Sequence, residues 1–357
     1  MADTSAPGSR ALIDAFPQLA DAVSWLPLGS YPTRIDRFEI PFADGTPRPI
    51  LVKREDLSGQ VYGGNKVRKL EFILAEAKAQ GARRLITAGA AGSHHALATA
   101  IYGSAIGFEV SLVLFPQRLT QHVREILLMD HAFGAELRWV PRMETVPLGT
   151  AAARLAHRRD RPYTIKPGGS AVIGTLGYVS AGLELAAQLQ AGEAQRPSAI
   201  HVAAGTLGTA AGLAIGLALA GERIPIRAVR ITSPIVANER ALKRLVEGVA
   251  SRLRAGGVAA ADAAAALRLV DFRHDRVGDG YGRATAAGDA ATAAFGEIGL
   301  RLDPTYTAKA AADLLDTPPA AAPPLFLHTL SANEPLDRLH GITASDLPAP
   351  FARYLDG

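Results

Sequence analysis

Short apolar runs alternate with longer stretches of helical periodicity along most of the chain. The apolar runs predict strands at residues 37–40, 49–53, 84–87, 109–115, 137–140, 163–166, 199–203, 226–232 and 325–329. The periodic stretches predict helices after Lys66 and over residues 94–106, 119–132, 146–158, 175–189, 236–253, 259–267, 284–298 and 308–315. Because strands buried on both faces appear as continuous apolar runs, this order predicts a doubly wound α/β protein with mostly parallel sheets.

The stretch Gly63-Gly64-Asn65-Lys66 leads into the most informative of these helices. One face of that helix is apolar and should be buried; it comprises Val67, Leu70, Ile73, Leu74 and Ala77. We expect Asn65 to cap the helix and Lys66 to lie in its first turn, where free N–H groups and the positive dipole end converge. Such a position lowers a lysine's pKa, as Schiff-base chemistry requires. The alternative is a glycine turn followed by a solvated Lys/Arg face.

Composition narrows the class of protein. A chain of 357 residues with 48% hydrophobic and 20% charged residues predicts a soluble globular protein of two lobes. The net charge of +4 is spread out, and its short arginine pairs lack interleaved aromatic residues, so we expect no nucleic-acid partner. Without cysteine there is no disulfide, Cys-ligated zinc or thiol nucleophile. We see no targeting segment or membrane-spanning run, and we expect a cytoplasmic protein.

In doubly wound folds, ligands bind at the carboxyl ends of the strands. The loop Gly205-Thr206-Leu207-Gly208-Thr209 follows a predicted strand and opens a helix, which suits a phosphate ester. The alternative is a tight turn with small residues for packing. Among the lysines, Lys78, Lys243 and Lys309 lie within helices and are expected to be solvated. Lys66 alone combines a glycine-rich loop with a helix start.

The motifs of the chain, in order, resemble one family of pyridoxal-phosphate (PLP) enzymes. The matching segments are residues 52–57, 63–71, 87–89, 93, 167–170, 174–178, 205–206, 280–282 and 303–307. They resemble the 1-aminocyclopropane-1-carboxylate deaminase / D-cysteine desulfhydrase family, which has the tryptophan-synthase β-like fold (fold type II). The resemblance implies a larger PLP-binding domain at 1–65 and 166–357, a smaller α/β domain at 66–165, and a site between them.

The resemblance also implies roles for individual residues. Lys66 would be the Schiff-base lysine, Ser93 a nucleophile or proton shuttle, and Thr307 the neighbour of the pyridine nitrogen. Tyr281 and Tyr306 would border the substrate. The remaining cofactor-binding positions would be Asn65, His94, Gly205, Thr206, Leu207, Gly208 and Thr209.

Three departures from the family pattern stand out. His94 replaces an asparagine that is expected to bind the phenolic oxygen of the cofactor, and Leu207 replaces a usual glycine. Leu330-Ser331 stands where the family prefers two glycines. By contrast, a threonine at 307 resembles the desulfhydrase type, and its hydroxyl favours elimination of a good leaving group over ring opening.

We therefore predict a PLP-dependent lyase or deaminase that acts on a small amino acid by α,β-elimination and gives a 2-oxo acid and ammonia. Ring opening of 1-aminocyclopropane-1-carboxylate and a β-replacement synthase are alternatives within the class. A non-catalytic PLP or amino-acid binding protein is the alternative from another class. We expect no metal, no membrane partner, and a homodimer as in the resembled family.

Overall fold

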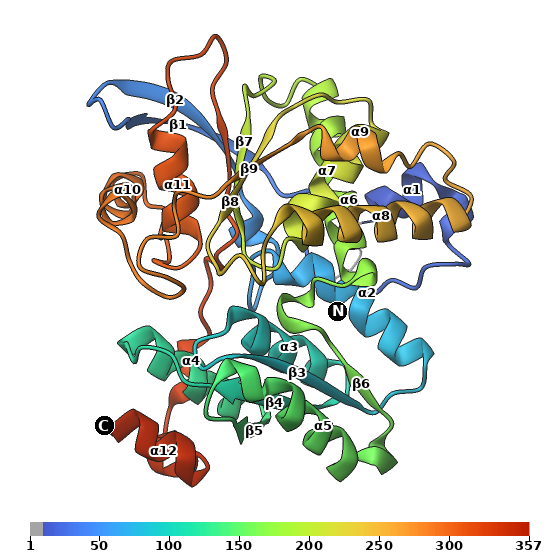
Figure 1. The fold of residues 1–357 in the computed structure, drawn as a ribbon, viewed down its shortest axis with the longest axis vertical. Coiled ribbons are helices and arrows are strands. Elements are labelled where there is room, and N and C mark those ends of the chain that lie inside the picture. Colours follow the sequence, from blue (N-terminus) through green and yellow to red (C-terminus); the bar gives the residue numbers. More distant parts are fainter. Residues whose placement is uncertain (1–9, 357) are drawn as a thin grey trace, which may run out of the picture.

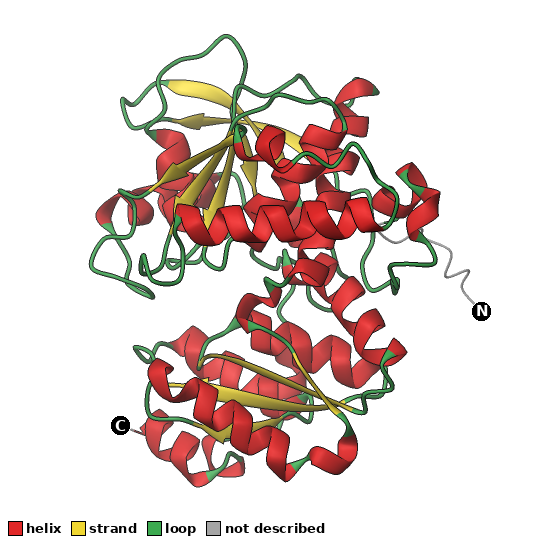
Figure 2. Ribbon diagram, turned by 45° about the vertical axis from the view of Figure 1, so that its right-hand side comes forward, coloured by secondary structure: helices red, strands yellow, loops and turns green. Residues whose placement is uncertain are grey.

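The computed structural model describes residues 10–356, which form two α/β lobes, each built on its own sheet (Figures 1 and 2). The strands of the larger sheet, in spatial order, are β1 (Ile35–Pro41), β2 (Pro47–Lys53), β10 (Leu325–Leu327), β7 (Ile200–Ala204), β8 (Ile226–Arg230) and β9 (Val270–Arg273). β1 pairs antiparallel with β2, and the other pairs are parallel. The sequence pattern predicted each of these strands except β9.

Helices cover both faces of the larger sheet because its strands are apolar on both sides. Val52 and Phe326 point to one face, and Leu51 and Leu327 to the other. The first face is covered by α10 (Ala286–Glu297) and α11 (Thr307–Leu315). The second is covered by α1 (Ala11–Ala15), α6 (Val172–Gln190), α7 (Gly208–Leu219), α8 (Glu239–Ala255) and α9 (Ala263–Leu267).

The smaller sheet is entirely parallel and is also covered on both faces. Its strands, in spatial order, are β5 (Glu136–Trp139), β4 (Glu109–Phe115), β3 (Arg84–Ala90) and β6 (Pro162–Thr164). On one face lies α5 (Val146–Ala156). On the other lie α2 (Lys66–Ala79), α3 (His94–Ala105) and α4 (Gln121–Ala132).

The helix α2 joins the two lobes (Figure 1). Its predicted apolar face is confirmed as buried, and it packs mainly in the core of the smaller lobe, whereas Phe72 packs in the core of the larger lobe. The predicted alternative of a solvated face after Lys66 is wrong, because Arg68 and Lys69 are also buried. Arg68 pairs with the buried carboxylates of Glu55 and Glu184.

The chain ends on the smaller lobe. The helix α12 (Ala349–Asp356) packs in that lobe's core. There the rings of Phe351 and Trp139 pack edge to face, with their centroids 5.2 Å apart. The predicted domain boundaries include this C-terminal segment in the larger domain. The domain boundaries given there stay a prediction, and residues 1–9 and 357 lie outside the described residues.

Over residues 10–356, α6 is the one helix long and apolar enough to cross a membrane by length and composition. In the fold, 72% of its apolar window is buried. It packs against α2 and α7 as a core helix of the larger lobe.

Candidate active site

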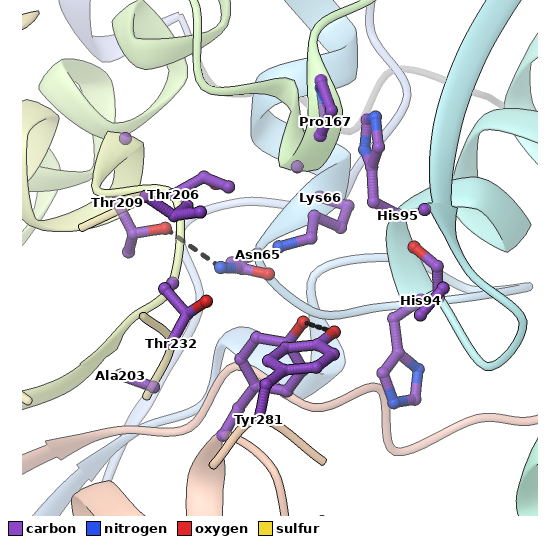
Figure 3. A pocket seen from close by; sticks show the side chains of 18 of the residues that line it. Asn65, Lys66, His94, His95, Pro167, Ala203, Thr206, Thr209, Thr232 and Tyr281 are labelled. Atoms are coloured by element: carbon purple, nitrogen blue, oxygen red, sulfur yellow. Dashed lines mark hydrogen bonds between the residues drawn. The ribbon is translucent and has the colours of Figure 1, made fainter. Parts of the chain in front are cut away.

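Loops at the carboxyl ends of the strands enclose a cavity of about 610 Å³ between the lobes (Figure 3). Its wall takes residues from both sheets, such as Ala88 in β3 and Ala203 in β7. The expected site residues that line it are Asn65, Lys66, Ser93, His94, Gly205, Thr206, Leu207, Gly208, Thr209, Tyr281 and Tyr306. Of the expected set, Thr307 alone does not line the cavity.

Lys66 is the first residue of α2, and its amine points into the cavity (Figure 3). The chain reaches it through Gly64, whose φ is +85° and whose added Cβ would lie 2.6 Å from the carbonyl oxygen of Thr329. Only glycine permits this close approach, which fixes where α2 begins. Burial lowers the pKa of Lys66 to about 8, against the opposing effect of Asp303. Part of the lysine is therefore a neutral, nucleophilic amine near neutral pH.

Asn65 does not cap α2, contrary to the prediction. Its backbone is already helical, with φ −68° and ψ −7°, and its side chain makes no capping hydrogen bond. A capping side chain normally requires an extended backbone at this position. The amide of Asn65 donates instead to Thr209 Oγ1 over 2.9 Å, drawn as the dashed line between these two labelled residues in Figure 3. This bond ties the start of α2 to the first turn of α7.

The loop from Gly205 to Thr209 forms a set of donors suited to an anion. The first N–H groups of a helix have no acceptor within it, and here those of α7 begin at the cavity wall. The hydroxyl of Ser170 lies 2.6 Å from Thr206 Oγ1 and accepts the Gly208 N–H over 3.2 Å. Ser170 was not among the expected site residues.

Lys69 completes this donor set and was not among the predicted site residues. Its side chain is buried, and its Nζ lies 3.2 Å from both Ser170 Oγ and the Gly168 carbonyl oxygen. Within residues 10–356, no carboxylate forms an ion pair with it. Burial, and then the charge of Lys66, hold its pKa well below 10.5. A buried ammonium without a counter-ion is costly, so the site favours an anion here.

Leu207 occupies a backbone conformation that explains why a glycine is usual at its position. Its φ is +69°, in the left-handed region that costs an ordinary residue about 1–2 kcal/mol. Its side chain is buried in the core of the larger lobe. Burial of the leucine offsets the backbone strain, and the loop keeps its shape.

Ser93 and His94 begin α3 at the opposite wall. Ser93 is the helix cap, and its Oγ accepts the N–H of Ala96 over 3.3 Å, which leaves its own hydrogen for a ligand. His94 Nδ1 lies 2.5 Å from the hydroxyl of Tyr62, and its Nε2 lies 3.3 Å from Nε2 of His122. Burial, followed by the repulsion that a protonated His122 would exert, lowers the pKa of His94 to about 4. The ring is therefore neutral at physiological pH.

Tyr281 and Tyr306 form a pair at the floor of the cavity. Their hydroxyls lie 2.6 Å apart, and their rings meet edge to face at 6.0 Å. Loss of hydration at the cavity raises the pKa of both above 10, although Tyr281 is 38% exposed, so both stay protonated and one hydroxyl hydrogen remains for a ligand.

Lys309 holds the loop that carries Tyr281. Its Nζ donates to the carbonyl oxygens of Val277 and Gly280 over 2.6 and 3.2 Å, and the side chain is buried. The expectation of a solvated Lys309 is wrong, because this face of α11 points toward the loop rather than to solvent.

Thr307 makes local contacts at the start of α11. Its hydroxyl donates to Asp303 Oδ2 over 2.7 Å, and its N–H donates to the same oxygen over 3.1 Å. Asp303 Oδ1 also accepts the N–H groups of Thr305 and Tyr306. Asp303, which lines the cavity and which the sequence analysis did not select, thus anchors the turn that places Tyr306.

Comparison with known proteins places this site in a family. The chain matches the model of the family described as pyridoxal-phosphate dependent enzyme over residues 29–328. A D-cysteine desulfhydrase of Salmonella paratyphi B (strain ATCC BAA-1250 / SPB7) is 35% identical over 297 residues, which are 79% of this chain and 86% of the relative. The nocardicin C-9' epimerase of Nocardia uniformis subsp. tsuyamanensis is 34% identical over 321 residues, 88% of this chain and 94% of the relative.

This chain is also similar to a solved structure of the same family. The crystal structure of an ACC deaminase homologue has a TM-score of 0.74 and 30% identity, and the match covers 89% of this chain and 94% of that one. The predicted fold class and the family resemblance are confirmed. The chain belongs to the 1-aminocyclopropane-1-carboxylate deaminase / D-cysteine desulfhydrase family of pyridoxal-phosphate dependent enzymes, with fold type II.

Proposed function

We propose that this protein removes the β substituent of a small amino acid by PLP-dependent α,β-elimination, with D-cysteine as the first substrate to test. Cysteine and water would give a 2-oxo acid, ammonia and sulfide. The observation that carries the proposal is the half-buried amine of Lys66, with its pKa of about 8, which points into a cavity that also presents an anion-binding loop. The similarity to D-cysteine desulfhydrase supports the choice of reaction and of cysteine.

The residues present fit the cofactor. PLP carries an aldehyde and a phosphate, and the cavity offers a nucleophilic amine and a donor set around Lys69 that no carboxylate of residues 10–356 neutralises. Lys66 would hold the aldehyde carbon, and Lys69, Thr206 and the first turn of α7 would hold the phosphate. When bound, the cofactor supplies the electron sink that stabilises negative charge at the substrate Cα.

The side chains around this position supply the proton transfers. Lys66, partly neutral at pH 7–8, takes the proton from Cα, and the capping hydroxyl of Ser93 is the alternative base. The Tyr281–Tyr306 pair stays protonated and donates to the substrate carboxylate or to the leaving group.

The role expected for Thr307 has less support than that of the other residues. Its hydroxyl is bonded to Asp303 and does not line the cavity. The choice between elimination and ring opening therefore rests on the products. The homodimer and the cytoplasmic location stay predictions.

The test is a panel of D- and L-cysteine, D-serine and 1-aminocyclopropane-1-carboxylate, with sulfide, ammonia and 2-oxo acid measured for each. We expect sulfide and 2-oxo acid in equal amounts from one enantiomer of cysteine. Lys66→Ala should abolish this, and Lys78→Ala, an exposed lysine on the same helix, should not. Unchanged turnover by Lys66→Ala would contradict the proposal.

The same panel separates the alternatives. Oxo acid from the cyclopropane substrate alone indicates ring opening, and a new thioether after addition of a second thiol indicates β-replacement. Loss of optical purity without oxo acid indicates epimerisation, the reaction named for one relative. Binding of PLP and amino acids without any turnover indicates a binding protein.

A further inference from the structure

Four polar side chains run one behind another from the cavity toward the surface. Tyr62 and His94 line the cavity, and the Tyr62 hydroxyl lies 2.5 Å from His94 Nδ1. His94 Nε2 lies 3.3 Å from His122 Nε2. His122 Nδ1 in turn lies 3.5 Å from Glu334 Oε1, and the His122 side chain is 32% exposed. The series thus has one end in the cavity and the other near solvent.

The hydrogens of this series can be placed from its chemistry. Burial raises the pKa of Tyr62 well above 10, so its hydroxyl keeps its hydrogen and donates to His94 Nδ1. Because His94 is neutral, its one ring hydrogen must then sit on Nε2 and point at His122 Nε2. This leaves the hydrogen of His122 on Nδ1, facing the carboxylate of Glu334. All donors therefore point outward, from the cavity to Glu334.

Charges around the series keep it in this state. Although burial raises the pKa of Glu334, Arg301, whose Nη1 lies 2.8 Å from Oε2, outweighs it and lowers that pKa overall. Glu334 thus remains a carboxylate that can take a proton. Around His94, the charge of Lys66 opposes its protonation, as a protonated His122 would, whereas Asp303 and Glu334 favour it.

We propose that Tyr62, His94, His122 and Glu334 form a proton-transfer path between the active-site cavity and solvent. In each transfer one O–H or N–H bond breaks as the next forms, so one proton leaves the cavity for each one that the outer pair gives to water; the side chains of this pair, His122 and Glu334, are 32% and 11% exposed. The reverse steps bring a proton in. The inference rests on the proposed function, since elimination takes a proton from Cα. The asparagine usual at position 94 has no ring with two nitrogens through which a proton can pass.

The first test measures the hydrogen positions by nitrogen-15 NMR of histidine-labelled holoenzyme at pH 7. His94→Asn and His122→Gln assign the two rings among the nine histidines. We expect His94 with its hydrogen on Nε2, and His122 with its hydrogen on Nδ1. A His94 ring with its hydrogen on Nδ1, or a positively charged one, overturns the path.

The second test measures whether the proton-transfer path contributes to turnover. His122→Phe should lower kcat roughly a hundredfold, leave KM within about twofold, and be rescued by added imidazole, since a positioned acid–base group contributes about 10²–10⁴-fold. His131→Phe, on the same helix α4 but outside the series, should behave as wild type. A wild-type kcat for His122→Phe, or a loss that imidazole does not restore in a variant with normal PLP content, overturns the path. His122→Gln repeats the test should the phenylalanine variant not fold.

Failure of this path and failure of the proposed function are distinguishable. If no amino acid is turned over, the proposed function fails, and the hydrogen positions of His94 and His122 still confirm or overturn the arrangement. If Lys66→Ala is inactive and His122→Phe is fully active, the function stands and the path is overturned.

Discussion

Asn65 donates a hydrogen bond to Thr209 Oγ1 over 2.9 Å, and this bond connects the residue before Lys66 to the first turn of α7. The two ends of the cofactor would be held by these two helix starts, so the bond holds the amine and the anion loop in one geometry.

A double-mutant cycle tests this connection. Asn65→Ala and Thr209→Val should each weaken PLP binding severalfold, since a hydrogen bond of this kind contributes about 1 kcal/mol. The double variant should lose little more than either single one, because both remove the same bond. The measurement is a fluorescence titration of cofactor-free protein with PLP. Strictly additive losses would show that the two residues act independently.

Leu207 provides a test of backbone strain in the anion loop. Both Leu207→Ala and Leu207→Gly lose the buried side chain and should destabilise the protein. Because φ is +69°, however, the glycine variant should be the more stable of the two by about 1 kcal/mol. At a position inside a right-handed helix, by contrast, the alanine variant would be more stable than the glycine variant. Urea unfolding of both variants gives the comparison, and a more stable alanine variant would contradict the left-handed conformation.

Much of the fold could be predicted because the relevant signals are local. Apolar runs marked most strands, and the apolar face of α2 was recognised from spacing alone. The strand β9 was missed although its apolar Val270 and Phe272 alternate with charged Asp271 and Arg273, which is the two-residue period of a half-buried strand. The helix α12 was missed as well, although its buried residues pack on the smaller lobe.

The charged residues near the site could not be predicted in the same way. Arg68 is buried because it meets carboxylates 13 and 116 residues away, and no local pattern shows such partners. Lys69 is buried beside Ser170, 101 residues further along the chain. Its spacing of three from Lys66, one turn along the same side of the helix, was the available signal.

Replacing Lys69 tests whether its buried charge serves the cofactor. In cofactor-free protein, Lys69→Met should raise the midpoint of urea unfolding, because burial disfavours the charged form of this lysine and no carboxylate of residues 10–356 compensates for it. The same variant should bind PLP roughly ten- to a hundredfold more weakly, since hydrogen bonds to charged groups contribute about 1.5–3 kcal/mol. Lys78→Met is the exposed control on the same helix. Unchanged PLP affinity in Lys69→Met would exclude a role at the phosphate.

The buried histidines predict loss of stability in mild acid. Burial lowers the pKa of His94 and of His328 from 6.5 to about 4. Unfolded chains take up these protons near pH 6.5, whereas the folded protein does so only near pH 4. The stabilisation is therefore complete above pH 6.5 and is lost as the pH falls to 4, by up to about 3 kcal/mol for each ring at 1.36 kcal/mol per pKa unit.

Urea unfolding at pH 7 and pH 4.5 measures this effect. His94→Asn should reduce the difference between the two pH values, and His131→Asn should leave it unchanged. An equal difference in wild type and His94→Asn would mean that His94 is not held neutral in the folded state.

The central claim is that Lys66 is the residue that binds PLP covalently. The most direct measurement is borohydride reduction of the PLP-loaded protein, followed by peptide mapping of the modified lysine. We predict an absorbance band of bound PLP that disappears on reduction, with the modification on Lys66. A protein that takes up no PLP, or a modification on Lys69 or another lysine, would contradict this account.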